Sequence, residues 1–235
     1  MDVRRLLSDM ALEVQHLTPA ETFERIAHYA RTAVDARDSG IMMVRARAKV
    51  APVSSTSDDV DRAHRLQVEC GEGPCLEAIF GTESSYVTGD AENDPRWPRW
   101  GSRVADLGYR SVVSVRLATV DRTYGSLNAY SRDVDDFSDQ DLEVMKYLAV
   151  HATVAIAGSL AVVGLQAALE SRNLIGQAQG ILMTTYDLDA DGAFQYLRRL
   201  SMDGNQRLFD VATQVVEQRH QLRSDRVRPQ PQDDD

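Results

Sequence analysis

The sequence has few cysteines and no excess of basic charge. Cys70 and Cys75 are the only cysteines in 235 residues, which excludes the disulfide-rich scaffold of a small secreted protein. Because 36 acidic residues outnumber 26 lysines and arginines, the net charge is −10, and a generally basic surface that holds polyanions non-specifically is excluded. The first residues lack the apolar stretch of a signal peptide, so we expect a cytoplasmic protein. The length fits one large domain, or one domain with a small second module.

Catalytic and metal-binding patterns are also missing. The five histidines are scattered, and the chain has no phosphate-binding loop, nucleophile elbow or zinc-protease motif. The two cysteines have no nearby histidine to complete a zinc site, so we interpret them as free thiols. A redox role for Cys75 stays open, because it follows Pro74 in the first turn of a predicted helix, where thiol pKa values fall. We predict that the chain is not an enzyme and has no metal site, and nothing in the sequence identifies a cofactor.

One acidic segment has the beginning of a calcium loop. Residues 187–192 read Asp-Leu-Asp-Ala-Asp-Gly, but the twelfth position, which should supply a carboxylate, is Arg198. We therefore interpret the segment as a turn in which Asp189 caps the next helix.

A long uncharged stretch raises the question of a membrane. Residues 148–168 carry no formal charge and qualify as a span by length. However, apolar or small residues recur from Leu142 at alternating steps of three and four, the pattern of a coiled-coil seam. We therefore expect no membrane span, but a homodimer in which the helix over 138–172 connects two domains and pairs with its copy. The seam positions are Met145, Ala149, Ala152, Ile156, Ser159 and Val163.

Helices and strands are mixed in the first 160 residues. Thr18-Pro19-Ala20-Glu21 predicts a helix start in which Thr18 is the cap and Glu21 completes a capping box. The loose alternation over 39–50 favours a strand, whereas the polar run 53–61 favours a turn or loop. The absence of regular βαβ spacing favours an antiparallel sheet with helices packed on it. Helices are predicted over 6–14, 19–34, 74–80 and 94–108, and extended segments over 39–50, 66–68, 86–87, 111–117 and 123–130.

The last third of the chain is predicted to be helical. Ser138 caps the long helix, and acidic residues in its first turn suit the helix dipole. Three helices are then predicted over 171–185, 189–201 and 205 to about 222. The end of the chain, 223–235, is expected to be disordered.

The helical C-terminal region resembles a known family. Residues 172–183 read Arg-Asn-Leu-Ile-Gly-Gln-Ala-Gln-Gly-Ile-Leu-Met, and they are followed by Asp191-Gly-Ala-Phe194, Leu197-Arg198, Ser201, Asn205 and Leu208…Val211-Ala212. These positions resemble an ANTAR domain, which we place at 166–222. The resemblance implies a three-helix RNA-binding module that prevents premature transcription termination by recognising paired stem-loops in a leader transcript.

The preceding region resembles a GAF domain of the kind joined to ANTAR, which we place at 1–160. The residues that carry the resemblance are Gly71-Glu-Gly-Pro-Cys75, Glu77-Ala78, Asp94-Pro-Arg-Trp-Pro98, Gly108-Tyr-Arg-Ser111 and Gly125-Ser-Leu-Asn128. The implied fold class is α+β: a GAF-like antiparallel sheet flanked by helices, then a long helix and an all-α ANTAR bundle. GAF ligands vary, so the resemblance implies sensing without naming what is sensed.

Side-chain chemistry selects candidate RNA contacts in the ANTAR region. Arginines can bind phosphate or stack on bases, glutamine amides can read base edges, and small residues allow close approach. Many ANTAR sequences have lysine at the position of Gln179, so one phosphate contact is expected to be missing here. Packing or a solvated surface is the alternative interpretation for each residue. The candidates are Arg172, Gln177, Ala178, Gln179, Gly180, Arg198, Arg199 and Arg207.

Five residues of the GAF region are candidates for a small-molecule pocket, with core packing as the alternative. They are Glu72, Cys75, Asp90, Trp97 and Tyr109.

The sequence thus predicts a cytoplasmic, dimeric regulator that binds stem-loops in nascent leader RNA under the control of a GAF sensor. Two alternatives stay open. One is a thiol-dependent redox enzyme, because free methionine sulfoxide reductases share a GAF-like fold. The other is a dimeric protein-interaction module that does not bind RNA.

Overall fold

A computed structural model describes residues 3–227. The chain divides after Ala161 into two compact units, which we describe separately.

The first unit is built on a five-stranded sheet with strand order β2-β1-β5-β4-β3. All neighbouring strands are antiparallel, as the sequence predicted. Side chains alternate between its faces, as a pleated strand requires. In β5, Leu127 and Ala129 face one side and Asn128 and Tyr130 face the other. The strands are β1 (Asp38–Val44), β2 (Val50–Ser55), β3 (Ser85–Thr88), β4 (Ser111–Ala118) and β5 (Thr123–Ser131).

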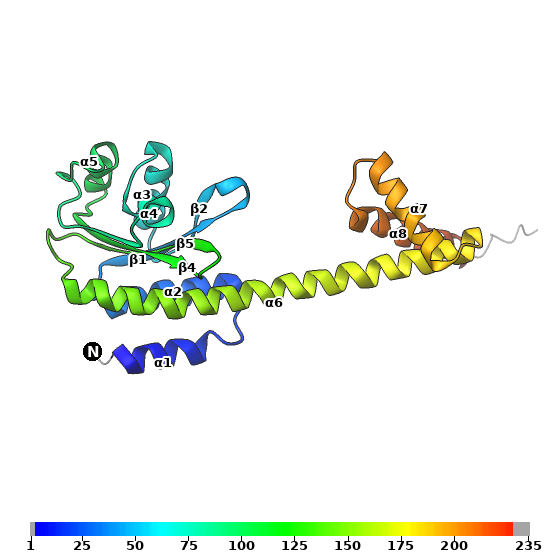
Figure 1. Cartoon of the computed structure of the whole chain (residues 1–235), viewed down its shortest axis with the longest axis horizontal. Helices are drawn as coiled ribbons and strands as arrows, with labels where there is room; N and C mark the ends of the chain where they lie inside the picture. Colours follow the sequence, from blue (N-terminus) through cyan, green and yellow to red (C-terminus); the bar gives the residue numbers. More distant parts are fainter. Residues whose placement is uncertain (1–2, 228–235) are drawn as a thin grey trace, which may run out of the picture. The chain divides into compact units, whose positions relative to one another are not determined.

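Helices cover both faces of this sheet (Figure 1). One face is covered by α2 (Pro19–Ala33) and the N-terminal part of α6 (Asp139–Tyr186), and α1 (Val3–Glu13) packs outside them. The opposite layer consists of α3 (Asp58–Cys70), α4 (Pro74–Phe80) and α5 (Pro98–Asp106). The two cores differ in kind: aliphatic side chains dominate the first, whereas the second contains Trp97, Trp100, Tyr109 and Tyr130.

The capping box at the start of α2 is confirmed, because Thr18 and Glu21 bond each other's backbone as predicted. The strand predicted over 39–50 is confirmed over 39–44 by β1, but the chain then turns at 46–48 and β2 begins at Val50. The loop predicted over 53–61 and the extended segment predicted over 66–68 were wrong, because β2 runs to Ser55 and α3 covers Asp58–Cys70. Polar residues there begin a helix: Ser57 accepts a hydrogen bond from Val60 N at 3.3 Å, and acidic residues fill the first turn.

The helix predicted to begin at Asp94 starts at Pro98 instead. The Asp94 carboxylate accepts hydrogen bonds from the backbone and side chain of Arg96, which hold a turn before the helix.

The second unit packs the C-terminal part of α6 with α7 (Ala190–Asp203) and α8 (Leu208–Val227). The helix predicted over 171–185 is part of the continuous α6. Asp189 caps α7 as expected, accepting from Gly192 N at 2.7 Å. Helix α8 runs to Val227, into the segment predicted to be disordered, and residues 228–235 lie outside the described part of the chain. The buried core is Ala178, Leu182, Ala193, Leu197, Val211 and Ala212.

Four of the six predicted seam positions are buried inside the protein's own first unit, whereas Ser159 is half-buried and Val163 is exposed in the second unit. Met145, Ala149, Ala152 and Ile156 pack against the sheet and α2, so a partner cannot reach them. Both a coiled-coil seam and the core-facing side of an amphipathic helix give apolar residues at steps of three and four, and here the sheet covers them.

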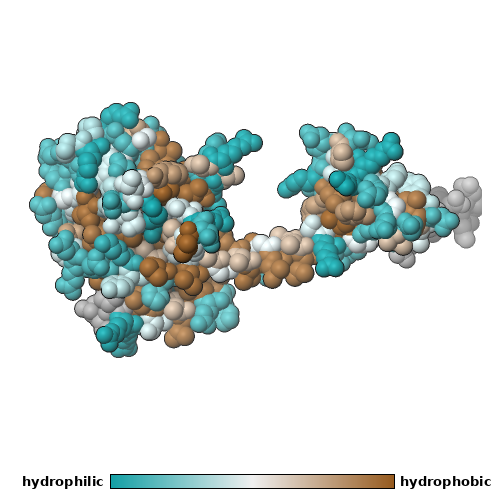
Figure 2. All heavy atoms as spheres, in the orientation of Figure 1, coloured by the Kyte–Doolittle hydropathy of each residue, from teal (hydrophilic) through white to brown (hydrophobic). Residues whose placement is uncertain are grey.

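Within the first unit, the outward face of α6 is also apolar, with Tyr147, Val150 and Val154 exposed. Figure 2 shows hydrophobic side chains along the uncovered part of this helix.

Helix α6 is apolar enough to be considered as a membrane span. Its packing argues against that interpretation, because Leu160 still packs against the core of the first unit and the first charge after it is Glu170. The uncharged residues 161–169 rise about 14 Å, whereas a bilayer core is about 30 Å thick. The N-terminal part of α6 is therefore a core helix of the first unit.

Candidate sensor site and nucleic-acid interface

Three predicted pocket residues are fully buried in the aromatic core of the first unit. Trp97 donates from Nε1 to Glu77 at 2.7 Å, and the Tyr109 hydroxyl donates to Asp38 at 2.8 Å. Cys75 of α4 is buried in the same core. Their polar atoms are paired within the protein, so these side chains pack the core.

The two predicted acidic pocket residues hold local structure. The Glu72 carboxylate accepts from the backbone N–H groups of Arg99 and Trp100 and so caps the start of α5. Desolvation opposes this effect, but these bonds hold the pKa of Glu72 below its usual value. Asp90 accepts from Asn93 Nδ2 at 2.6 Å. None of the five predicted residues lines a cavity described below.

Cys75 is a protected thiol. It receives hydrogen bonds from Gln67 Nε2 at 2.8 Å and from Ser114 at 3.4 Å, and complete burial raises its pKa. The expectation that its helix position lowers this pKa was wrong, because desolvation of the thiolate outweighs the hydrogen bonds. A neutral, buried thiol is a poor nucleophile.

A polar cluster that the sequence analysis missed lies between α3 and the sheet. His64 of α3 is completely buried, and its Nε2 lies 3.2 Å from Nδ2 of Asn128 in β5. Burial lowers the pKa of His64 to about 3. The ring is therefore neutral, and since Nε2 accepts from the amide, the proton sits on Nδ1. Gly40 makes room for the ring, because a Cβ there would lie 2.7 Å from His64 Cε1.

Three buried atoms of this cluster have no hydrogen-bond partner within the described chain: His64 Nδ1, Asn128 Oδ1 and Ser126 Oγ. Buried polar groups normally have partners, so such a group of free donors and acceptors suits a small polar ligand or ordered water. His64 lies between the loop predicted over 53–61 and the extended segment predicted over 66–68, so the sequence analysis did not place it on a helix facing β5.

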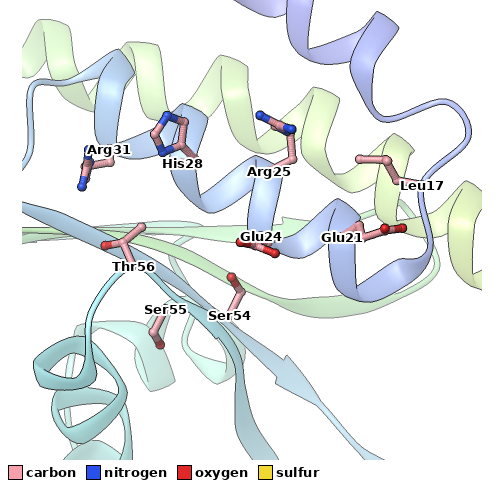
Figure 3. Close-up of a pocket in the computed structure, with 9 residues that line it drawn as sticks. All are labelled: Leu17, Glu21, Glu24, Arg25, His28, Arg31, Ser54, Ser55 and Thr56. Carbon is pink, nitrogen blue, oxygen red and sulfur yellow. The ribbon is translucent and has the colours of Figure 1, made fainter.

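A surface cleft of about 510 Å³ runs between α2 and β2 (Figure 3). Arg25 and His28 point away from β2. The Glu21 carboxylate turns back to Thr18 as part of the capping box. Arg25 also pairs with Glu13 at 3.3 Å. The mixed charges favour neither an anionic nor a cationic ligand.

In the second unit, the structure brings two predicted RNA-binding residues together. Arg172 and Gln177 line an open hollow of about 590 Å³ on α6, together with Leu169, Asn173 and Gly176. A Cβ at Gly176 or at Gly180 would meet nothing within 4 Å. The backbone on this side of the helix is therefore open to a ligand.

Two predicted RNA contacts have structural roles instead. Ala178 is completely buried in the core of the second unit, which corrects its assignment as an RNA contact. Gln179 is half-buried and donates from Nε2 to the Ala190 carbonyl at 3.1 Å, which ties α6 to the start of α7. A small residue at position 178 is needed for helix packing.

The four predicted arginines are exposed, but they differ in their pairing. Arg199 pairs with Asp203 at 3.6 Å, and Arg207 pairs with Asp210 at 3.0 Å. Within the described residues, Arg172 and Arg198 form no such ion pair. Exposed pairs contribute roughly 0–1 kcal/mol, so phosphate can compete for the paired arginines, while Arg172 and Arg198 are free cations.

The fold consists of an α+β domain on a five-stranded antiparallel sheet and a separate helical domain. The GAF domain family matches residues 16–157 and the ANTAR domain family matches residues 164–216. The chain belongs to the GAF family and carries a C-terminal ANTAR domain, which makes it a regulator of the antitermination type.

Similar proteins support this assignment domain by domain. The nitrate regulatory protein of Klebsiella oxytoca is 38% identical over 66 residues, which cover 28% of this chain and 16% of that protein. The GAF domain of a phosphoenolpyruvate-protein phosphotransferase from Coxiella burnetii superposes with a TM-score of 0.58 at 15% identity, covering 70% of this chain and 98% of that one. Free methionine-R-sulfoxide reductase from Neisseria meningitidis superposes with a TM-score of 0.54 at 18% identity, covering 68% of this chain and 91% of that one. At this level of identity, the two structural similarities show a shared fold and not a shared function.

Proposed function

We propose that this chain is a cytoplasmic regulator that binds paired stem-loops in nascent leader RNA and prevents transcription termination, under the control of its GAF domain. The ANTAR match over residues 164–216 carries the proposal. The free cations Arg172 and Arg198, together with the open hollow beside Gly176, support it, because phosphate contacts supply most of the affinity for RNA.

The proposed dimer uses the outward face of α6. In the first unit, Tyr147, Val150, Val154, Ala157 and Ala161 follow one another at steps of three and four, as a coiled-coil seam requires. Two-fold pairing places the same apolar side chains against each other. A dimer carries two ANTAR domains, so binding of one stem-loop raises the effective concentration of the second.

The sensor site proposed here is the buried polar cluster of His64, Asn128 and Ser126. Its ligand is a small polar molecule that accepts from His64 Nδ1 and donates to Asn128 Oδ1. Ser126 and Asn128 alternate along β5 with Leu127 and Ala129, which pack in the same core as α6. A shift of β5 on ligand binding is thereby passed to the helix that carries the dimer face.

Charge reversal at the free arginines tests RNA binding. A pool of twin-hairpin RNAs with randomised loops is selected on the wild type, and its affinity for the Arg172→Glu, Arg198→Glu double variant is then measured against salt. We expect weaker binding, with a slope of log K against log salt that is smaller by about 1.4 for two lost contacts. The control is Arg122→Glu, an exposed charge reversal in the first unit. Equal affinities and slopes for wild type and double variant would refute the proposed interface.

A further inference from the structure

An exposed pair of tyrosines lies where α6 ends and α7 begins. Tyr186 is the last residue of α6, and Tyr196 lies on α7. Their ring centroids are 5.5 Å apart, and the ring planes are inclined by 33°. The exposed fractions of the two residues are 56% and 38%. Two rings are thus held against each other on the surface of the second unit.

This pair differs from the buried tyrosines of the first unit. Tyr109 and Tyr130 have no exposed surface, and their hydroxyls are hydrogen-bonded. Within the described residues, neither Tyr186 nor Tyr196 has a hydrogen bond from its hydroxyl. A tyrosine in a protein core is stabilised by burial of its ring and by a hydrogen bond from its hydroxyl. Tyr186 and Tyr196 are exposed and have no such hydrogen bond within the described residues, so neither contribution explains why the two rings lie together.

We propose that Tyr186 and Tyr196 form a platform on which an unpaired base of the RNA stacks. This inference rests on the proposed function, and it adds base recognition to the phosphate contacts of the arginines. Unpaired loop bases stack on aromatic side chains, and every base offers a π-face.

The ring geometry fixes how a base can bind. A base between two rings needs a centroid separation of about 7 Å, twice the 3.4 Å spacing of stacked bases. The observed 5.5 Å is too short for insertion. The base therefore stacks on the outer face of Tyr186, the more exposed ring, and Tyr196 supports that ring from behind.

The charges near the two tyrosines favour one place for the phosphate beside the stacked base. Arg199 follows Tyr196 by three residues, so the two side chains are neighbours on α7. Asp187 and Asp191 flank the turn between the helices and repel phosphate. The phosphate next to the stacked base therefore lies on the Arg199 side of the platform.

Loop fluorescence and affinity test this inference together. The probe is a selected twin-hairpin RNA with 2-aminopurine at successive loop positions, whose fluorescence falls when the base stacks. The variants are Tyr186→Ala, Tyr196→Ala and Tyr186→Phe. The control is Met202→Ala, an exposed apolar residue six positions beyond Tyr196 on the same helix. Circular dichroism and thermal unfolding verify that each variant is folded.

We expect Tyr186→Ala to weaken binding about 5- to 150-fold and to abolish quenching at one loop position. Tyr196→Ala should have a smaller effect of the same kind. Tyr186→Phe and Met202→Ala should bind within about twofold of wild type, because both keep the stacking ring.

Other results would overturn the inference in distinguishable ways. If charge reversal at Arg172 and Arg198 weakens binding while both alanine variants bind and quench as wild type does, the platform is wrong and the proposed function stands. If the wild type binds no RNA from the pool, both are wrong. If Tyr186→Ala leaves RNA binding intact but abolishes nuclease-resistant capture of a protein, the rings are a protein contact.

Discussion

Replacement of Val150 and Val154 by alanine should dissociate the dimer while the protomer stays folded. These side chains are 63% and 68% exposed in the single chain, so they contribute little to its folding. Each substitution removes two methyl groups, whose complete burial contributes about 1.6 kcal/mol. Because about two thirds of each side chain is still exposed in the single chain, dimer formation can gain about 1 kcal/mol at each position. Two positions in each of two chains then cost about 4 kcal/mol, close to a thousandfold in the dimer dissociation constant.

Sedimentation velocity over a range of concentrations measures this effect directly. The control is Val120→Ala, a fully exposed valine in the turn between β4 and β5. We expect the control to dimerise as the wild type does and the double variant to sediment as a monomer at the same concentrations. The reasoning is refuted if all three proteins share one dissociation constant, or if the wild type remains monomeric at every concentration.

Three further predictions concern the interior of the first unit. Ile156→Ala, on the opposite face of α6, should lower the free energy of unfolding by about 2–5 kcal/mol, and denaturant titration at a concentration where the variant is still dimeric should show it. The pKa of His64 is about 3 in the folded protein and near 6.5 in the unfolded chain. The unfolded chain therefore binds more protons between these pH values, and the free energy of unfolding falls as the pH drops from about 6.5 towards 3. Urea titrations at several pH values should show that His64→Gln flattens this dependence. Cys70 and Cys75 are buried, so iodoacetamide should label them at neutral pH only after denaturant is added, and rapid labelling of the native protein would contradict the assignment of Cys75 as a protected thiol.

Local signals in the sequence predicted much of the fold. The capping residues Thr18 and Asp189 each mark a helix start correctly, because a cap is decided by a few neighbouring residues. The errors occur where one pattern suits two structures. The polar run before α3 looks like a loop, yet Ser57 and the acidic residues after it begin a helix.

The same ambiguity explains which parts of the site could be predicted. The period of α6 was visible, but which face meets the sheet depends on residues far away in the chain, so the seam at Met145 and Ile156 was assigned to a partner. Arg172 and Gln177 were recognised from their chemistry and do share a hollow. Ala178 belongs to the core instead. The cluster of His64 and Asn128 depends on a contact between α3 and β5, which no local pattern reveals.

The affinity of the wild type for a twin-hairpin RNA, compared with a single hairpin of the same loop sequence, tests the central claim most directly. Binding of two linked stem-loops by a dimer should make the twin hairpin bind about 10²- to 10⁴-fold more tightly at equal salt. The Val150→Ala, Val154→Ala protein should lose most of that advantage and keep its affinity for the single hairpin. Equal affinity of the wild type for the two RNAs would contradict the account of a dimeric regulator that holds paired stem-loops.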